Sequence, residues 1–240
     1  MSTIKEVLRQ TEHRPTDLPS GSWQYHQEWQ NVLMLHWKVP YDKLRSMVPE
    51  ALELDTHKNE AYVSLIGFTM HKIRLKNLPS VWLMSHFEEI DIRTYIKING
   101  RKGFYFLNVE ASKLLPSTSG RILSGFPYEK ATIHRSGNTL VSVNSEKQFY
   151  LDTEYEVKGA LPKLTELDKW FAERYYLYLD KNDHIYRYDV HHKPWKLKEL
   201  FLRKLDMDYR IGAITLNGMP DYAHFTKGGK VLAWKRKKIM

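Results

Sequence analysis

Short segments with the residue pattern of β-strands follow one another along most of this chain, and they restrict its fold more than any other feature. They occupy residues 32–39, 52–56, 61–70, 87–98, 103–110, 128–135, 139–146, 148–157, 175–179 and 184–192. Helical patterns are fewer and shorter, at 3–13, 40–49, 117–125 and the start of 165–179. Residues 196–205 fit a helix or a strand, because a short apolar run does not define its period. The sequence therefore predicts a mainly β (α+β) fold, an antiparallel barrel or sandwich with a few short helices.

The composition is that of an ordinary soluble globule, with 42% hydrophobic and 27% charged residues. We expect a single domain over residues 1–240, with a short helical extension at 1–20 and a basic tail at 235–240. The chain has no cysteine, which excludes disulfide scaffolds, thiol catalysis and iron–sulfur clusters. No apolar run reaches the roughly 18 residues of a membrane span, and the first residues lack the apolar core of a signal peptide. We therefore expect a cytoplasmic protein that does not enter a membrane.

The net charge of +9 is concentrated near the end of the chain. Residues 227–240 contain six basic and no acidic residues, so the rest of the chain is close to balanced. Such a tail can hold RNA or an anionic surface by electrostatic attraction. It is more often a solvated end, and no known nucleic-acid-binding motif accompanies it. Nucleic-acid binding is therefore the weaker alternative.

The segment FEEIDIRTYIKI, residues 87–98, separates two kinds of side chain by strand alternation. One face holds Ile90, Ile92, Thr94, Ile96 and Ile98. The other face holds Glu89, Asp91, Arg93, Tyr95 and Lys97. This polar face either meets water, as in many antiparallel sheets, or lines the interior of a barrel, where buried charges need partners and are often functional. The residues alone do not decide between the two.

Three further clusters combine aromatic and ionisable residues: Arg121 with residues 125–128, residues 173–178, and residues 191–195. The adjacent His191 and His192 suggest a metal, but neighbours on a strand point to opposite faces and do not readily share an ion. The sequence also lacks the phosphate-binding and dinucleotide-binding glycine motifs and the nucleophile motif G-x-S-x-G. We therefore expect no metal and no cofactor.

In this order, the clusters resemble the YqjF-like family of uncharacterised bacterial proteins, in the acetoacetate-decarboxylase-like superfamily. The resemblance covers about residues 25–235. It is carried by LHWKVP (35–40), LRSMVPEALELDT (44–56), FEEIDIRTYI (87–96), GRILSGFPYEKA (120–131), WFAERYYLY (170–178), VHHKPW (190–195) and PDYAHFTKGGKVLAW (220–234). It implies a cone-like antiparallel β-barrel with small peripheral helices and a ligand cavity inside. That fold favours the barrel-lining interpretation of residues 87–98.

The same resemblance argues against one reaction. Acetoacetate decarboxylases carry a lysine after G-[FY]-P, and this lysine forms a Schiff base with the keto acid. Here Gly125-Phe126-Pro127 is followed by Tyr128, whose phenol cannot form an imine. Lys130 lies on the same strand face but about 6–7 Å further along. The superfamily's cavity glutamate is matched by Glu89, so the chain resembles a scaffold that keeps the carboxylate without the nucleophile.

The candidate site therefore combines Glu89 as a general base with Tyr128 as a hydrogen-bond donor or general acid. Arg93 would bind a ligand carboxylate or phosphate, because its planar guanidinium fits such groups. Glu89 and Arg93 lie about 13 Å apart along the strand, which favours a shared ligand over direct pairing. The supporting candidates are Tyr95, His36, Arg121, Arg174 and His192.

Three functions remain open at this point. The first is a barrel that binds a small molecule, such as a carboxylate or keto compound, and acts on it without a Schiff base. The second is a non-catalytic ligand sensor or carrier on the same barrel. The third is RNA or anionic-surface binding through the tail. Related barrels often assemble through their outer faces, so the resemblance also leaves a homo-oligomer open.

Overall fold

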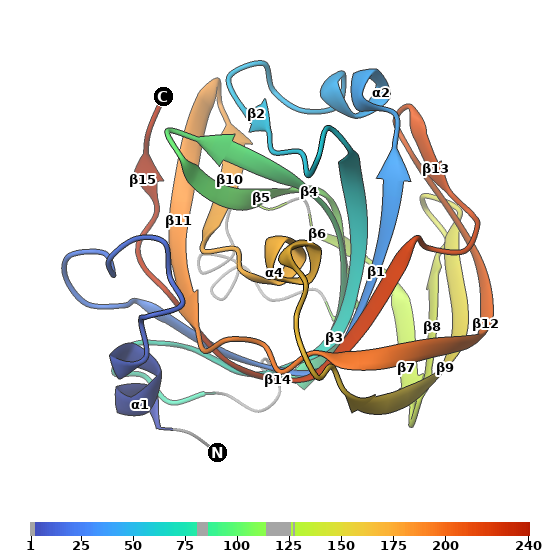
Figure 1. The fold of residues 1–240 in the computed structure, drawn as a ribbon, viewed down its shortest axis with the longest axis horizontal. Coiled ribbons are helices and arrows are strands. Elements are labelled where there is room, and N and C mark those ends of the chain that lie inside the picture. The colour runs from blue at the N-terminus through green and yellow to red at the C-terminus, as the bar shows by residue number, and fades with distance from the viewer. Residues whose placement is uncertain (1–2, 81–85, 114–125, 127) are drawn as a thin grey trace.

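Most of the chain is β-strand, as the strand-like segments predict (Figure 1). The computed structural model describes residues 3–80, 86–113, 126 and 128–240. Seven strands pair into a closed ring: β1 (Tyr25–Val39), β3 (Ala61–Leu75), β4 (His86–Ile98), β5 (Arg101–Ala111), β10 (Tyr176–Lys181), β11 (His184–His192) and β14 (Tyr222–Ala233). Pairing of β11 with β14 closes this ring, which confirms the mainly β architecture.

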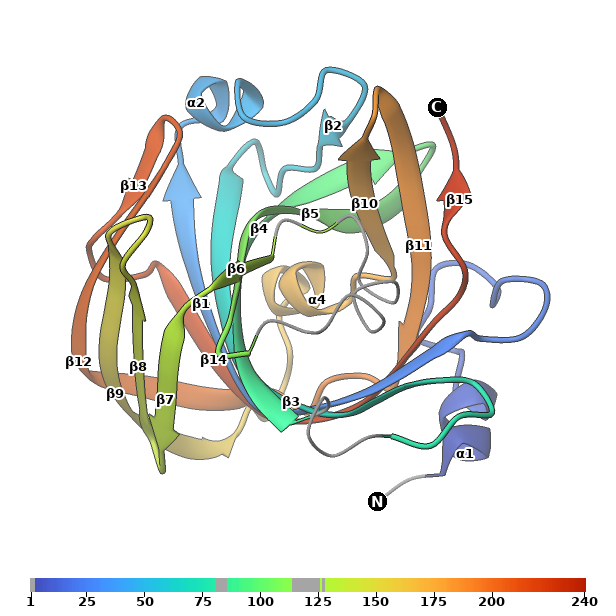
Figure 2. The ribbon, with the colours of Figure 1, turned by 180° about the vertical axis from the view of Figure 1, so that it is seen from behind.

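A second group of strands extends the sheet beyond the ring. It comprises β12 (Lys198–Ile211), β9 (Phe149–Ala160), β8 (Thr139–Asn144) and β7 (Thr132–Ser136), which follow β14 in that order. Four short strands pair at the margins of the whole sheet, three of them with strands of the ring and one with the second group: β2 (Glu53–Leu54) with β4, β6 (Tyr128–Lys130) with β5, β15 (Lys237–Lys238) with β11, and β13 (Ile214–Leu216) with β12. Figure 2 shows the second group to one side of the ring.

The alternation in residues 87–98 has the predicted consequence, but both faces are buried over residues 89–96. Ile90, Ile92 and Ile96 join the large apolar core outside the ring, with residues of the second group such as Leu140. The opposite face points into the ring, where Glu89 is 3% and Arg93 7% exposed. From Glu89 to Tyr95, the interpretation that this polar face meets water is therefore wrong, and the inward-facing one is confirmed. Lys97, the last residue of that face, is 36% exposed and pairs with Glu53.

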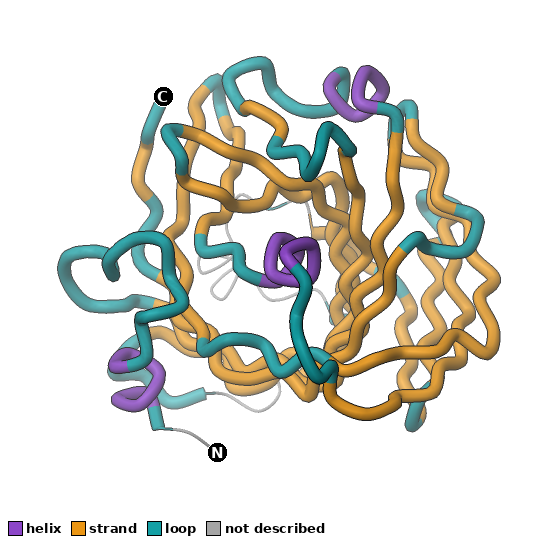
Figure 3. Tube along the Cα trace, viewed as in Figure 1, coloured by secondary structure: helices purple, strands orange, loops and turns teal. Residues whose placement is uncertain are grey.

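The helices in the described part of the chain are short: α1 (Ile4–Arg9), α2 (Tyr41–Arg45) and α4 (Glu166–Ala172) (Figure 3). Thr3 and Thr165 start α1 and α4 with complete capping boxes, each side chain accepting from the backbone N–H three residues on. Figures 1 and 2 both place α4 at the centre of the ring. Its Trp170 and Phe171 pack against aromatic side chains that β3 and β4 point inward. None of the described helices is long and apolar enough to cross a membrane.

Several element boundaries differ from the sequence predictions. The helices expected at 3–13 and 40–49 are shorter, and the strand expected at 128–135 is divided at residue 131 into β6 and β7. Residues 198–205 of the ambiguous segment 196–205 belong to a strand, β12, and the helix expected at 117–125 lies outside the described residues. The β5–β10 and β5–β6 pairs are parallel, so the sheet is not wholly antiparallel.

Strand β14 was not predicted, because its glycines interrupt the pattern of a strand. Gly228 has φ +87°, and a Cβ at this position would lie 2.0 Å from the carbonyl oxygen of Trp29 on β1. Only glycine combines this backbone conformation with such a close approach. The same residue that hides the strand from pattern analysis therefore allows β14 to pair with β1.

Candidate functional site

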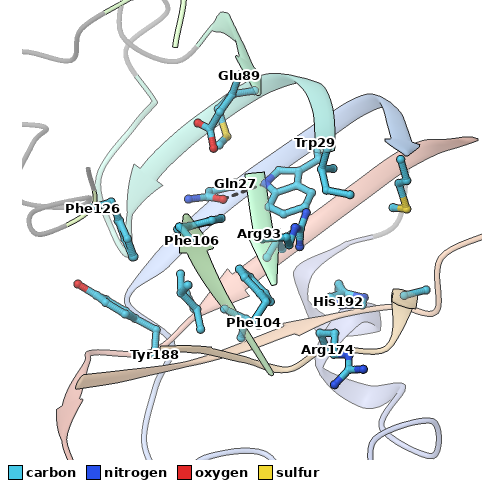
Figure 4. A pocket seen from close by; sticks show the side chains of 18 of the residues that line it. Gln27, Trp29, Glu89, Arg93, Phe104, Phe106, Phe126, Arg174, Tyr188 and His192 are labelled. Atoms are coloured by element: carbon cyan, nitrogen blue, oxygen red, sulfur yellow. Dashed lines mark hydrogen bonds between the residues drawn. The ribbon is translucent and has the colours of Figure 1, made fainter. Parts of the chain in front are cut away.

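A cavity of about 90 Å³ lies inside the ring, with room for several waters or a small organic molecule. Figure 4 shows the side chains that surround it. Its walls are mainly apolar, with a strong aromatic contribution from Tyr25, Trp29, Phe104, Phe106, Phe126 and Tyr188. A few ionisable groups converge among these rings, which is the usual make-up of a small-molecule site.

Glu89 is the most perturbed carboxyl of the cavity. Its side chain is buried, and among the described residues it accepts a hydrogen bond from Tyr128 alone, with 3.0 Å between the phenol oxygen and Oε2. Desolvation, reinforced by nearby Asp91, raises the pKa of Glu89 to about 8 despite the opposing effects of Tyr128 and Arg93. Desolvation and Glu89 in turn raise the pKa of Tyr128 well above its ordinary value. The pair can therefore hold one exchangeable proton near neutral pH.

Arg93 does not reach Glu89 but pairs with Asp91, two residues away on the same strand face. Its Nε donates to Oδ1 at 2.8 Å and its Nη2 donates to Oδ2 at 3.3 Å. Burial raises the pKa of Asp91 to about 6, although Arg93 counteracts this effect. The guanidinium also lies over the ring of Phe104, 4.6 Å from its centroid. Among the described residues, the hydrogen bonds of Arg93 use Nε and Nη2, and none uses Nη1.

His192 forms part of the opposite wall. Its ring is stacked against Trp195 and Tyr175, and its Nδ1 lies 2.8 Å from the carbonyl oxygen of Lys193. Desolvation lowers the pKa of His192 to about 3, so the ring is neutral. A neutral ring that donates through Nδ1 keeps Nε2 as an acceptor.

Arg174 also borders the cavity, but its guanidinium is largely occupied elsewhere. Nη1 donates to Asp55 at 2.5 Å and Nε donates to the carbonyl oxygen of Trp170 at 2.6 Å. The charged group lies over the rings of Tyr95 and Trp170. These contacts tie the segment between α4 and β10 to Asp55 and to α4, and only the buried Nη2 has no partner among the described residues.

His36 lies behind the cavity wall rather than in it. Ser64 Oγ lies 2.6 Å from both the His36 Nδ1 and the Tyr95 hydroxyl, and the imidazole is stacked on Phe171, which does line the cavity. Burial lowers the pKa of His36 well below its ordinary value. His36 therefore supports the wall as a neutral group.

Six of the eight predicted site residues line the one cavity: Glu89, Tyr128, Arg93, Tyr95, Arg174 and His192. His36 contacts two lining side chains without lining the cavity itself. Arg121 lies outside the described residues. Lys130 is exposed, and no lysine is among the described residues that line the cavity.

Sequence reasoning did not single out Asp91 as the partner of Arg93, nor Gln27 and Trp29 as lining residues. Asp91 stands on the polar face of the 87–98 pattern, so the signal for it was present. Gln27 and Trp29 lie in the first part of β1, before the predicted strand at 32–39. Polar residues in this first part obscure the alternation of apolar and polar side chains. Trp29 donates to Gln27 Oε1 at 2.9 Å within the cavity wall (Figure 4). Within the described ranges, no three His, Asp or Glu side chains are arranged to hold a metal ion.

Comparison with known sequences gives a match over most of the chain. Residues 26–229 match the model of DUF2071, described as an uncharacterized conserved protein. The chain is 30% identical over 232 residues to the uncharacterized protein YqjF of Bacillus subtilis (strain 168), an alignment covering 92% of this chain and 95% of that protein.

Comparison with solved structures gives the same fold at low sequence identity. An acetoacetate decarboxylase from Legionella pneumophila is 12% identical with a TM-score of 0.61, covering 98% of this chain and 95% of that one. The enduracididine biosynthesis enzyme MppR, in a structure described as complexed with pyruvate, is 13% identical with a TM-score of 0.59 and 93% coverage of both chains. An acetoacetate decarboxylase-like enzyme from Sphingomonas wittichii RW1 is 11% identical with a TM-score of 0.55, covering 95% of this chain and 99% of that one. These similarities identify the fold as acetoacetate-decarboxylase-like.

Proposed function

The chain belongs to the DUF2071 family of uncharacterized conserved proteins, and we propose that it binds a small oxo acid and moves a proton at the carbon beside the carbonyl. No Schiff base is involved. The observation that carries this proposal is the contact between the buried Glu89 and the partly buried Tyr128 in the wall of a mainly apolar cavity, where Glu89 gains or loses its proton near neutral pH. An acid or base whose pKa lies near the working pH is the most effective proton carrier.

The proposed step is an enolisation. The ionised Glu89 carboxyl takes a proton from the carbon beside the carbonyl, and the electron pair of the C–H bond becomes the C=C bond of the enolate. Once Glu89 is protonated, the Tyr128 hydroxyl is free to donate to the enolate oxygen. Return of the proton from Glu89 to carbon regenerates the carbonyl compound, so atoms and charge balance over the cycle.

Arg93 accounts for the acid group of the proposed ligand. Asp91 fixes the guanidinium through Nε and Nη2, which leaves Nη1 to donate to a ligand carboxylate. The Glu89 and Arg93 side chains both border the cavity (Figure 4). A small ligand that spans them would bring its carbonyl side to Glu89 and its carboxylate to Arg93.

Two observations favour non-covalent chemistry over imine formation. Tyr128 occupies the position after Gly125-Phe126-Pro127 where the decarboxylases that the chain resembles have lysine, and the described residues of the cavity wall include no lysine. The neighbour described as complexed with pyruvate makes simple 2-oxo acids the first ligands to test.

The test is the exchange of carbon-bound hydrogen for deuterium, followed by NMR, with pyruvate, 2-oxobutanoate and acetoacetate as probes. We expect at least one probe to exchange faster with the protein than in buffer, and we expect Glu89→Gln to abolish the acceleration. Tyr128→Phe should reduce it, while Tyr178→Phe, which alters a buried hydroxyl outside the cavity, should not. The absence of binding and of accelerated exchange for all three probes would refute the proposal.

A carrier is the second candidate, favoured by one observation. Asp91 neutralises Arg93, and Glu89 is largely protonated at neutral pH, so the mainly apolar cavity carries little net charge. Such a site suits reversible storage of a small molecule. Saturable binding of a probe with no accelerated exchange would favour the carrier over the enzyme.

A further inference from the structure

Strand β6 brings Tyr128 to the cavity, but it is only three residues long. It pairs in parallel with β5, with Tyr128 opposite Val109 and Glu129 opposite Glu110. Because neighbouring residues of a strand point to opposite faces, Tyr128 points into the ring while Glu129 points out, toward the second group of strands. A short strand at a sheet margin has few backbone hydrogen bonds to fix its position.

On the outer face, Asn144 of β8 connects the two glutamates. Its Nδ2 donates to Glu110 Oε1 at 2.8 Å and to Glu129 Oε2 at 3.1 Å, while its Oδ1 accepts from the backbone N–H of Lys147 at 3.1 Å. Both amide hydrogens and the amide oxygen are therefore used, which fixes the orientation of the side chain. Asn144 is 1% exposed and Glu110 is fully buried.

Glu110 is itself held in place from a third strand. The Tyr209 hydroxyl of β12 donates to Glu110 Oε2 at 2.9 Å, and Ser142 Oγ lies 3.4 Å from the same oxygen. By contrast, the other side-chain partner of Glu129 among the described residues is Lys147, whose side chain is 47% exposed, and an ion pair with such an exposed lysine constrains little. Apart from the backbone pairing of β6 with β5, the described side-chain contact of Glu129 with a buried residue is therefore the one with Asn144.

We propose that Asn144 is a positioning residue for the cavity: by holding Glu129 on the outer face, it keeps the Tyr128 hydroxyl in contact with Glu89 on the inner face. The consequence for proton transfer rests on the proposed function, but the positioning itself does not. The second group of strands is thereby part of the site, although none of its side chains lines the cavity among the described residues.

The test measures the protonation of Glu89 in the ligand-free protein, by NMR of side-chain-labelled glutamate across a pH series. Tyr128 stabilises the ionised form, so Tyr128→Phe should raise the pKa of Glu89. Asn144→Leu should raise the pKa of Glu89 as well, and combining the two substitutions should raise it no further than Tyr128→Phe alone. A merely structural role of Asn144 would lower stability and leave the titration of Glu89 unchanged.

Two further variants complete the design. Ser142→Ala removes the longest contact of Glu110 without touching Glu129, and it should leave the titration of Glu89 as in the wild type. If Asn144→Leu does not fold, Glu129→Ala removes the same link from its half-buried end and should raise the pKa of Glu89. A folded Asn144→Leu or Glu129→Ala with wild-type titration of Glu89 overturns the proposal. Because no ligand is involved, this result is independent of whether any oxo acid exchanges hydrogen.

Discussion

Glu89 and Glu110 are two buried carboxyl groups on neighbouring strands, and they differ in how many hydrogen bonds they accept. Glu89 on β4 is 3% exposed and points into the ring, whereas Glu110 on β5 is fully buried and points to the outer core. Glu110 receives hydrogen bonds from Tyr209, Asn144 and Ser142. Glu89 receives one described hydrogen bond, from Tyr128.

This difference in hydrogen bonding distinguishes a carboxyl that serves the packed core, Glu110, from one that can accept a further hydrogen bond from a ligand, Glu89. A buried polar group is costly unless it is hydrogen-bonded, so three donors around Glu110 are what a packed core requires. A single donor leaves Glu89 with unused acceptor capacity beside a cavity, which a ligand can supply. Desolvation raises the pKa of both groups, but it takes the pKa of Glu89 to about 8, into the range where a proton can be exchanged.

The largest expected effect is on the pH dependence of stability. The pKa of Glu89 rises from 4.5 to about 8 on folding, so between these values the folded protein retains a proton that the unfolded chain has lost. The free energy of unfolding should therefore fall as the pH rises from 4.5 through 8, by up to about 4 kcal/mol for this group. Urea denaturation across this range should show a smaller decrease in Glu89→Gln than in the wild type. Equal pH profiles would show that Glu89 is not desolvated as the structure indicates.

The second-largest expected effect is the difference in stability between two matched variants, in which leucine replaces either Glu110 or Glu89. Glu110→Leu leaves the Tyr209 hydroxyl and an Asn144 N–H buried without an acceptor, and we expect a loss of about 3 kcal/mol in the free energy of unfolding. Among the described residues, Glu89→Leu leaves the Tyr128 hydroxyl alone unpaired, and it removes a desolvated acid, so the change should stay within about 1 kcal/mol. Urea denaturation of both variants at pH 7 measures this difference. Similar losses would mean that Glu89 is also part of the structural core.

The sequence predicts much of the inner face of the ring because the relevant signals are local. Alternation within one strand places Glu89, Arg93 and Tyr95 together, and the resemblance at residues 125–128 brings in Tyr128. The Arg93–Asp91 pair was missed although it follows from the same alternation. The reason is that spacing along a strand does not predict with which of several nearby acidic side chains an arginine forms an ion pair.

The outer network could not be predicted from sequence. Glu110 and Asn144 are 34 residues apart, and Tyr209 is 99 residues from Glu110. Their contact depends on how β8 and β12 pack against β5, which no local period encodes. Strand β14 was missed for a different reason, since Gly228 is required by a close backbone approach rather than by a strand pattern.

The smallest effect distinguishes the two tyrosines that donate to these carboxyls. Tyr128→Phe and Tyr209→Phe each remove one hydroxyl, and each should cost about 1 kcal/mol in the free energy of unfolding. For Tyr128→Phe the cost should grow as the pH rises past 8, because the hydroxyl stabilises the ionised form of Glu89. After Tyr209→Phe, Glu110 still accepts hydrogen bonds from Asn144 and Ser142. The cost of Tyr209→Phe in the free energy of unfolding should therefore change less with pH than that of Tyr128→Phe. Denaturation of both variants at pH 6 and pH 9 measures the two slopes. A steeper pH dependence for Tyr209→Phe would reverse the assignment, because it would make Glu110 the carboxyl that depends on a single donor.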